Sequence, residues 1–143
     1  MGLDSFCVAT PSGTGTTALY LRQYLPKKID VVTASIVGDK YTLYSQWNKL
    51  EPNVDNLPKI LDKLPKHPFA KPKKEYFDIW LSLRESGIEF DLIYAPKMWL
   101  ELIESYNILK KPILYIHSGG TIGNISQIEQ YRYKGIFEIS KIS

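Results

Sequence analysis

The chain has 143 residues, of which 44% are hydrophobic and 23% are charged, and its formal net charge is +3. These values are typical of one globular domain with a buried core. Cys7 is the only cysteine, which excludes an intrachain disulfide, and with only two histidines no zinc site is expected. No apolar run approaches about 20 residues, the length of a membrane span, and no signal peptide is recognisable. The chain is therefore expected to be cytoplasmic.

Lysines are concentrated between Lys59 and Lys74. A basic stretch of this kind can bind nucleic acid or a membrane surface. Here it is interrupted by Pro65, Pro68 and Pro72, and it lacks a recognisable nucleic-acid-binding signature. We therefore interpret it as a solvated loop, and neither nucleic acid nor membrane is an expected partner.

The first half of the chain alternates short β-branched or apolar runs with helical patterns. A proline ends the first helical pattern, and an aspartate is placed to cap the second. The predicted elements are a strand at Ser5–Ala9, a loop at Thr10–Gly15, a helix at Thr16–Leu25 ended by Pro26, a strand at Ile29–Val37 and a helix from Asp39 to about Asn48.

The second half begins with a proline-rich stretch and then resumes the alternation. The predicted elements are a short helix near Asn56–Leu64, a helix at Lys73–Ser86 capped by Gly87, a strand at Phe90–Ala95, a helix from Pro96, a strand at Pro112–His117 and a helix at Ile122–Tyr131. The helix from Pro96 is amphipathic, with an expected apolar side of Met98, Trp99, Leu102, Ile103 and Tyr106.

Strands that alternate with helices predict a three-layer α/β/α fold with a mostly parallel sheet of about four strands. In such sheets ligands bind beyond the carboxyl ends of the strands. Three loops are predicted at that edge, at Thr10–Gly15, Tyr94–Lys97 and Ser118–Gly120. A buried strand so close to Met1 would need neighbours, so we expect upstream elements to be missing and exposed sheet edges to favour homo-oligomers.

The first loop has the chemistry of a phosphate site. Glycines at 13 and 15 let the backbone turn tightly, and the following helix directs its N-terminal amides and its dipole at the loop. Hydroxyl groups come from Ser12, Thr14, Thr16 and Thr17. The run is neither a P-loop nor a dinucleotide-binding motif, and it could also be a simple strand-to-helix turn.

Three motifs in order resemble the C-terminal segment of fold-type II pyridoxal-phosphate enzymes, in the branch of 1-aminocyclopropane-1-carboxylate (ACC) deaminase and D-cysteine desulfhydrase. Ser12 to Thr16 resembles their phosphate loop, Asp91 to Lys97 resembles their Asp-Pro-Val-Tyr-x-Gly-Lys segment, and Ile113 to Gly120 resembles their last strand and His-Thr-Gly-Gly turn. Ser118 to Gly123 is also similar to the asparaginase threonine motif, but the second threonine-aspartate cluster of that family does not follow.

The resemblance implies a pyridoxal 5'-phosphate site. Its phosphate would be bound by Ser12, Gly13, Thr14, Gly15 and Thr16. Tyr94 would be the active-site tyrosine and a candidate acid or base, and Ser118 would lie beside the pyridine nitrogen. A core tyrosine and a turn serine remain the structural alternatives, and His117 is expected to be structural.

The chain departs from that family in two respects. The lysine that binds the cofactor aldehyde should lie upstream of the phosphate loop, where this chain has no match, so residues 1–143 are expected to be the C-terminal segment of a cofactor-binding domain and inactive alone. Phe69 takes the place of a further active-site tyrosine, and Ala95 replaces an acidic residue or threonine. Opening of a cyclopropane ring is therefore not expected, and the expected substrate is a small amino acid.

Two further hypotheses remain open from the residues alone. The chain could be a non-catalytic module that binds a phosphate ligand, or it could be an assembly unit that associates through an exposed sheet edge.

Overall fold

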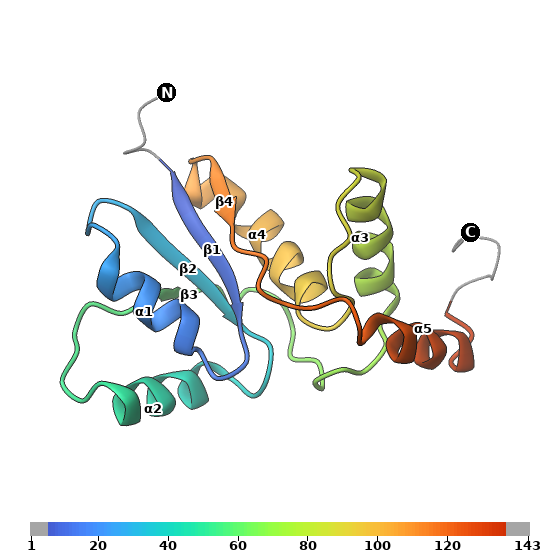
Figure 1. The fold of residues 1–143 in the computed structure, drawn as a ribbon, viewed down its shortest axis with the longest axis horizontal. Helices are drawn as coiled ribbons and strands as arrows, with labels where there is room; N and C mark the ends of the chain where they lie inside the picture. Colours follow the sequence, from blue (N-terminus) through green and yellow to red (C-terminus); the bar gives the residue numbers. More distant parts are fainter. Residues whose placement is uncertain (1–5, 137–143) are drawn as a thin grey trace.

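The computed structural model describes residues 6–136, which form an α/β fold. Within these residues one sheet has the strand order β3-β2-β1-β4, and every neighbouring pair is parallel (Figure 1). The strands are β1 (Cys7–Ser12), β2 (Asp30–Ser35), β3 (Lys59–Ile60) and β4 (Ile113–Tyr115). The predicted four-stranded parallel sheet is thus confirmed.

Helices cover both faces of this sheet. They are α1 (Thr16–Tyr24), α2 (Lys40–Leu50), α3 (Lys74–Glu85), α4 (Ala95–Leu109) and α5 (Asn124–Tyr133). Figure 1 shows α1 and α2 on one side of the sheet and α4 on the other, with α3 and α5 beyond α4. The three-layer prediction is therefore confirmed. No helix within residues 6–136 is long and apolar enough to cross a bilayer.

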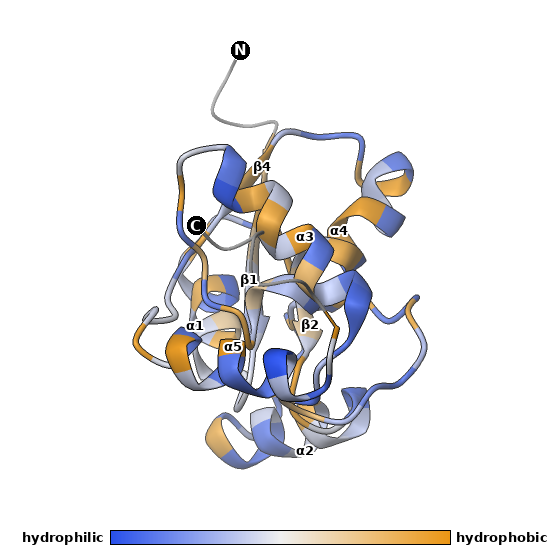
Figure 2. Ribbon diagram, turned by 90° about the vertical axis from the view of Figure 1, so that its right-hand side faces the viewer, coloured by the Kyte–Doolittle hydropathy of each residue, from blue (hydrophilic) through white to orange (hydrophobic). Residues whose placement is uncertain are grey.

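Alternate residues of β1 build the two halves of the core. Cys7 and Ala9 pack in a cluster with Met98 and Leu102 of α4, whereas Val8 belongs to a cluster on the α1 side. Side chains that alternate between two buried faces are expected of a parallel strand with helices on both sides. Figure 2 colours the helices in alternating hydrophobic and hydrophilic stretches, as elements with one covered face require.

Two helix boundaries follow the sequence prediction closely. Asp39 is the N-cap of α2, and its carboxylate accepts a hydrogen bond from the Thr42 amide at 3.0 Å. This bond and the one from the Thr42 hydroxyl lower the pKa of Asp39. At the other boundary, α1 ends at Tyr24 with the extended Leu25 as its C-cap, as expected of the residue before Pro26, and the buried Arg22 side chain donates to the Pro26 carbonyl at 2.7 Å.

Two predicted elements are wrong. The segment near Asn56–Leu64 is not a helix but contains β3, because the edge of β2 takes it as a parallel neighbour and the Leu61 amide bonds to the Thr33 carbonyl at 2.7 Å. Phe90–Ala95 is not a strand, because side chains rather than a neighbouring strand satisfy its backbone. The sheet has the expected number of strands, but one of them is a different segment.

Smaller differences concern the first strand and α4. The strand prediction at Ser5–Ala9 lies partly outside the described residues, and β1 continues to Ser12 into the predicted loop, because its whole length pairs with β2. On α4, Met98 and Leu102 are buried as predicted, but Ile103 and Tyr106 are exposed. The covered face of α4 is therefore narrower than the apolar pattern indicated.

We predict that Gly15→Ala destabilises the fold by about 3 kcal/mol or more, because the substitution combines a left-handed backbone with an overlap in the core. Gly15 has φ +82°, and a Cβ there would lie 2.5 Å from Trp47 Nε1 and 2.8 Å from Leu43. Urea denaturation measures the effect.

The matched control is Gly87→Ala, since Gly87 has φ +89° with nothing within 4 Å of the added Cβ. It should cost about 1 kcal/mol, from the backbone alone. Equal losses in the two variants would contradict a packing requirement at Gly15.

Candidate functional site

A cavity of about 420 Å³ lies at the carboxyl edge of the sheet. It is formed where β1 runs into α1, where α4 begins and where the chain leaves β4. All the residues that the sequence proposed for cofactor binding line it, namely Ser12, Gly13, Thr14, Gly15, Thr16, Tyr94 and Ser118. The fold therefore brings together three segments that span more than a hundred residues of the chain.

The start of α1 leaves backbone donors available to this cavity. Gly15 is the N-cap of α1 and provides no side-chain cap, so the first-turn amides lack the usual side-chain acceptor. The hydroxyls of Thr14 and Thr16 lie 3.1 Å apart on the exposed side of the loop. Amides and hydroxyls together make a neutral set of donors of the kind that binds phosphate.

Ser12 lines the cavity but turns its hydroxyl toward the sheet. The Thr33 hydroxyl donates to the Thr10 carbonyl at 2.7 Å, so it accepts the proton of Ser12, whose Oγ lies 2.5 Å away. Ser12 is 2% exposed. The Ser12 hydroxyl thus joins β1 to β2. A ligand in the cavity would contact the residues that follow Ser12 rather than its hydroxyl.

Tyr94 lies at the N-cap position of α4, and its ring covers Gly13. A Cβ on Gly13 would lie 3.4 Å from Tyr94 Cε1 and 3.6 Å from the hydroxyl oxygen. On another side the Phe69 ring packs against it, with the ring centroids 5.8 Å apart. The tyrosine therefore reaches the phosphate-type loop directly, and a Cβ at position 13 would be in ordinary van der Waals contact with its ring.

Asp91 and Asn124 hold the segment that carries Tyr94, and the sequence analysis predicted no role for either: Asp91 only began the second motif, and Asn124 lay outside all three. The buried Asp91 carboxylate accepts hydrogen bonds from the amides of Ile93 (3.0 Å) and Tyr94. The buried Asn124 side chain accepts from the Leu92 amide at 2.7 Å and donates to the Phe90 carbonyl at 3.0 Å. An aspartate just before the proline-marked start of a helix was the available signal for Asp91.

The third loop follows β4 and brings Ser118 and Gly119 to the cavity. Ser118 is exposed, and a Cβ on Gly119 would lie 3.0 Å from Asp91 Oδ1. The preceding His117 stacks on Phe90 with the ring centroids 4.9 Å apart, and it does not line the cavity. The close approach of Gly119 to Asp91 thus joins the second and third loops.

Gln46 of α2 is a further lining residue that sequence reasoning missed. Its Oε1 is buried and has no hydrogen-bond partner among the described residues. A buried carbonyl oxygen without a donor is costly, so it favours a ligand or water at this position. Nothing in the local sequence distinguishes Gln46 from other polar residues of a surface helix.

The lining described here carries no charged side chain. An anion would therefore be bound by amides, hydroxyls and the dipole of α1 rather than by a salt bridge. The same lining contains no lysine, so within residues 6–136 the cavity itself has no primary amine to react with a carbonyl.

We predict that Asn124→Ala destabilises the fold by about 2 to 4 kcal/mol, because it leaves the buried Leu92 amide without its partner and removes one of the two donors to the Phe90 carbonyl, which retains only the Trp80 indole at 2.8 Å. Scanning calorimetry measures the loss. Gln130→Ala, at an exposed position of the same helix, should change stability by no more than about 0.5 kcal/mol. A similar small effect at Asn124 would show that these two hydrogen bonds do not position the segment.

No protein-family model matches the chain, and no curated protein matches it. Among solved structures, the crystal structure of an ACC deaminase homologue matches with a TM-score of 0.69 and 19% sequence identity. The match covers 91% of this chain and 45% of that one, so this chain spans less than half of the length of that protein. The three-layer arrangement around the cavity is therefore a fold that an ACC deaminase homologue also has.

Proposed function

We propose that this chain is the C-terminal, cofactor-binding segment of a pyridoxal-phosphate-dependent deaminase or lyase that acts on a small amino acid. The observation that carries the proposal is the meeting of three motifs in one cavity. Residues 12–16, Tyr94 and Ser118 resemble the cofactor-binding residues of pyridoxal-phosphate enzymes, and all of them line it. The shared fold with an ACC deaminase homologue supports the same proposal at the level of architecture.

The cofactor phosphate would bind at the start of α1. The amides of the first turn and the hydroxyls of Thr14, Thr16 and Thr17 would donate to its oxygens. Gly13 and Gly15 would let the phosphate approach the backbone, because neither carries a side chain into the loop. The cavity volume of about 420 Å³ is within the range of small-molecule sites.

The pyridine ring would lie between Tyr94 and Ser118. The Ser118 hydroxyl would donate a hydrogen bond to the ring nitrogen and so favour an unprotonated ring. Tyr94, fixed through its backbone by Asp91, would hold its hydroxyl where a proton must be moved at the substrate. When bound, the cofactor supplies an electron sink that stabilises negative charge at the substrate's α-carbon.

The missing group in this scheme is a lysine. No lysine lines the cavity within the described residues, so catalysis would require an amine from outside this lining. The chain by itself would bind the cofactor without turning over an amino acid, and association with a second copy or with further chain would complete the enzyme.

A second candidate is a non-catalytic module that binds a phosphate ligand. The same absence of lysine from the described lining favours it. Both proposed functions require the phosphate loop. They differ at Tyr94 and Ser118, because only a ligand with an aromatic ring next to its phosphate would contact these two residues.

We predict that the chain binds pyridoxine 5'-phosphate saturably, as measured by isothermal titration calorimetry. This ligand lacks the aldehyde, so it does not react with surface lysines. Gly13→Asp should weaken binding by at least about tenfold, because a carboxylate in the loop repels the phosphate.

The matched control is Ser126→Asp, which adds the same charge at an exposed position of α5. It should leave the affinity unchanged. If the pyridine ring lies beside Tyr94, Tyr94→Ala should weaken the binding of pyridoxine 5'-phosphate but not the binding of glycerol phosphate, which has no ring. Equal binding of pyridoxine 5'-phosphate by the wild type and Gly13→Asp would refute the phosphate-loop assignment.

A further inference from the structure

A second cavity, of about 500 Å³, lies next to the candidate cofactor site. Its lining comes from the loop after β2, the first turn of α2, the loop after β3 and the first turn of α4. In the loop after β2, Val37 lines the first cavity and its neighbour Gly38 lines the second. At the start of α4, Tyr94 lines the first cavity and Lys97 lines the second. The two cavities are therefore neighbours along the carboxyl edge of one sheet, one strand apart.

Lys97 is the distinctive group of this second cavity. Its ammonium donates to the Ser35 carbonyl at 2.8 Å, which uses one of its three protons. Burial lowers its pKa. Glu101, the fully buried carboxylate on the next turn of α4, accepts instead from the amides of Lys63 and Leu64, each at 3.0 Å. No ion pair of Lys97 occurs among the described residues, so its remaining donors are available to a ligand.

The other titratable groups of the lining leave an excess of positive charge. Asp39 is engaged by the amide and hydroxyl of Thr42, and Lys66 lies 3.9 Å from its other oxygen. His67 is held through Nε2 by the Lys71 carbonyl at 2.9 Å. The lining thus holds two ammonium groups and one carboxylate that is already hydrogen-bonded. The carboxylates of Glu101 and Asp62 also act on Lys97, from outside the lining, and the excess of positive charge in the lining itself favours an anion.

Tyr94 and Lys97 are three residues apart on the same helical turn, which places their side chains on one face. A molecule whose reacting carbon lies beside Tyr94 can thus extend a short side chain toward Lys97. We infer that the second cavity binds an acidic side chain of the substrate, so that the substrate is an amino acid with a second anionic group, such as an amino dicarboxylic or amino sulfonic acid. This inference rests on the proposed function and names its substrate class.

The test uses stable conjugates that need no lysine for binding. N-(5'-phosphopyridoxyl)-aspartate and N-(5'-phosphopyridoxyl)-asparagine, each in both enantiomeric forms, have nearly the same shape and differ in the charge of the side chain. Calorimetric titration of the chain should show that one enantiomer of the aspartate conjugate binds about tenfold more tightly than its asparagine counterpart.

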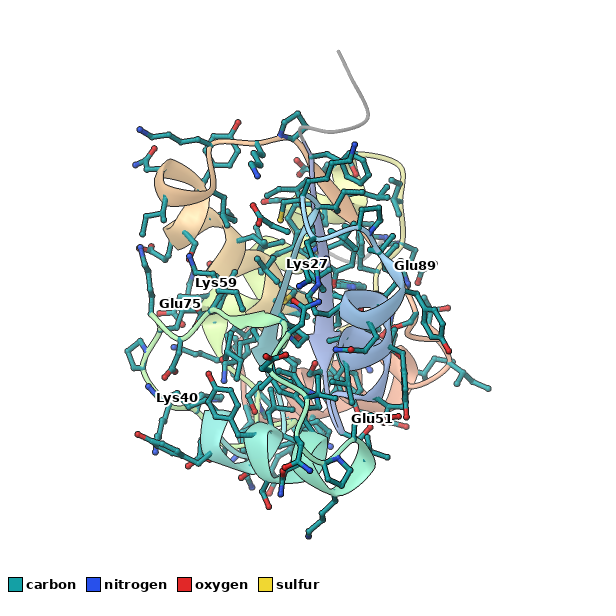
Figure 3. The ribbon with its side chains drawn as sticks, turned by 90° about the vertical axis from the view of Figure 1, so that its left-hand side faces the viewer. Lys27, Lys40, Glu51, Lys59, Glu75 and Glu89 are labelled. Carbon is teal, nitrogen blue, oxygen red and sulfur yellow. The ribbon has the colours of Figure 1, made fainter. Side chains whose placement is uncertain are left out.

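Lys97→Met, which retains most of the apolar stem, should abolish this preference and leave the affinity for the asparagine conjugate unchanged. The control is Lys27→Met, which removes the same charge from the loop before β2, near the amino end of the sheet. Figure 3 labels Lys27 there and Lys40 at the start of α2, the helix whose first turn lines the second cavity. The control should retain the preference.

Equal affinities of the wild-type chain for the two conjugates would overturn the acidic substrate while leaving the cofactor site standing. A preference that survives in Lys97→Met would overturn the role of the second cavity. Failure of both conjugates to bind would count against the proposed function itself, and the inference would fall with it.

Discussion

The contact between Trp47 and Gly15 is the constraint on which the candidate site depends. The indole Nε1 of Trp47 donates to the Gly15 carbonyl at 2.8 Å, and the indole is 1% exposed. Gly15 ends the loop after β1 and begins α1, so this single hydrogen bond ties β1, α1 and α2 together. The same carbonyl accepts the first hydrogen bond of α1, from the Leu19 amide at 3.0 Å, and Gly15 offers no side-chain cap to the first-turn amides. Only glycine can occupy this position, both for its φ of +82° and for the space that Trp47 takes.

A second constraint brings the other two loops to the same place. Asp91 and Asn124 satisfy the backbone of residues 90–94, which has no neighbouring strand to bond to. The same aspartate lies against Gly119, so the start of α4 and the loop after β4 are positioned by one buried carboxylate. Tyr94 then reaches Gly13 from across the sheet edge. The cavity is thus built from side chains that replace missing backbone partners, and these side chains position Tyr94 rather than contact a ligand.

Much of the fold and the composition of the cavity could be predicted from the sequence. β-branched runs, the Asp39 cap and the proline boundaries are local signals, and they identified β1, β2, β4 and all five helices within the described residues. The strand β3 could not be found in this way, because Lys59 and Ile60 become a strand only when β2 offers them its edge. Phe90–Ala95 has a strand-like composition, but Asp91 and Asn124 compete for its amides, and the role of Asn124 depends on a contact 32 residues away. The inward turn of the Ser12 hydroxyl likewise depends on Thr33 in another strand.

The central claim is that three separate segments form one ligand site. The most direct test is an amide chemical-shift map of the isotopically labelled chain, recorded as pyridoxine 5'-phosphate is added. Our account predicts saturable shifts in all three segments at once, at Gly13–Thr17, at Tyr94 and at Ser118–Gly120, with a common dissociation constant. Shifts confined to the start of α1 would indicate a simple anion site at a helix terminus. The absence of any saturable shift in a folded chain would contradict the claim that these segments form a cofactor site.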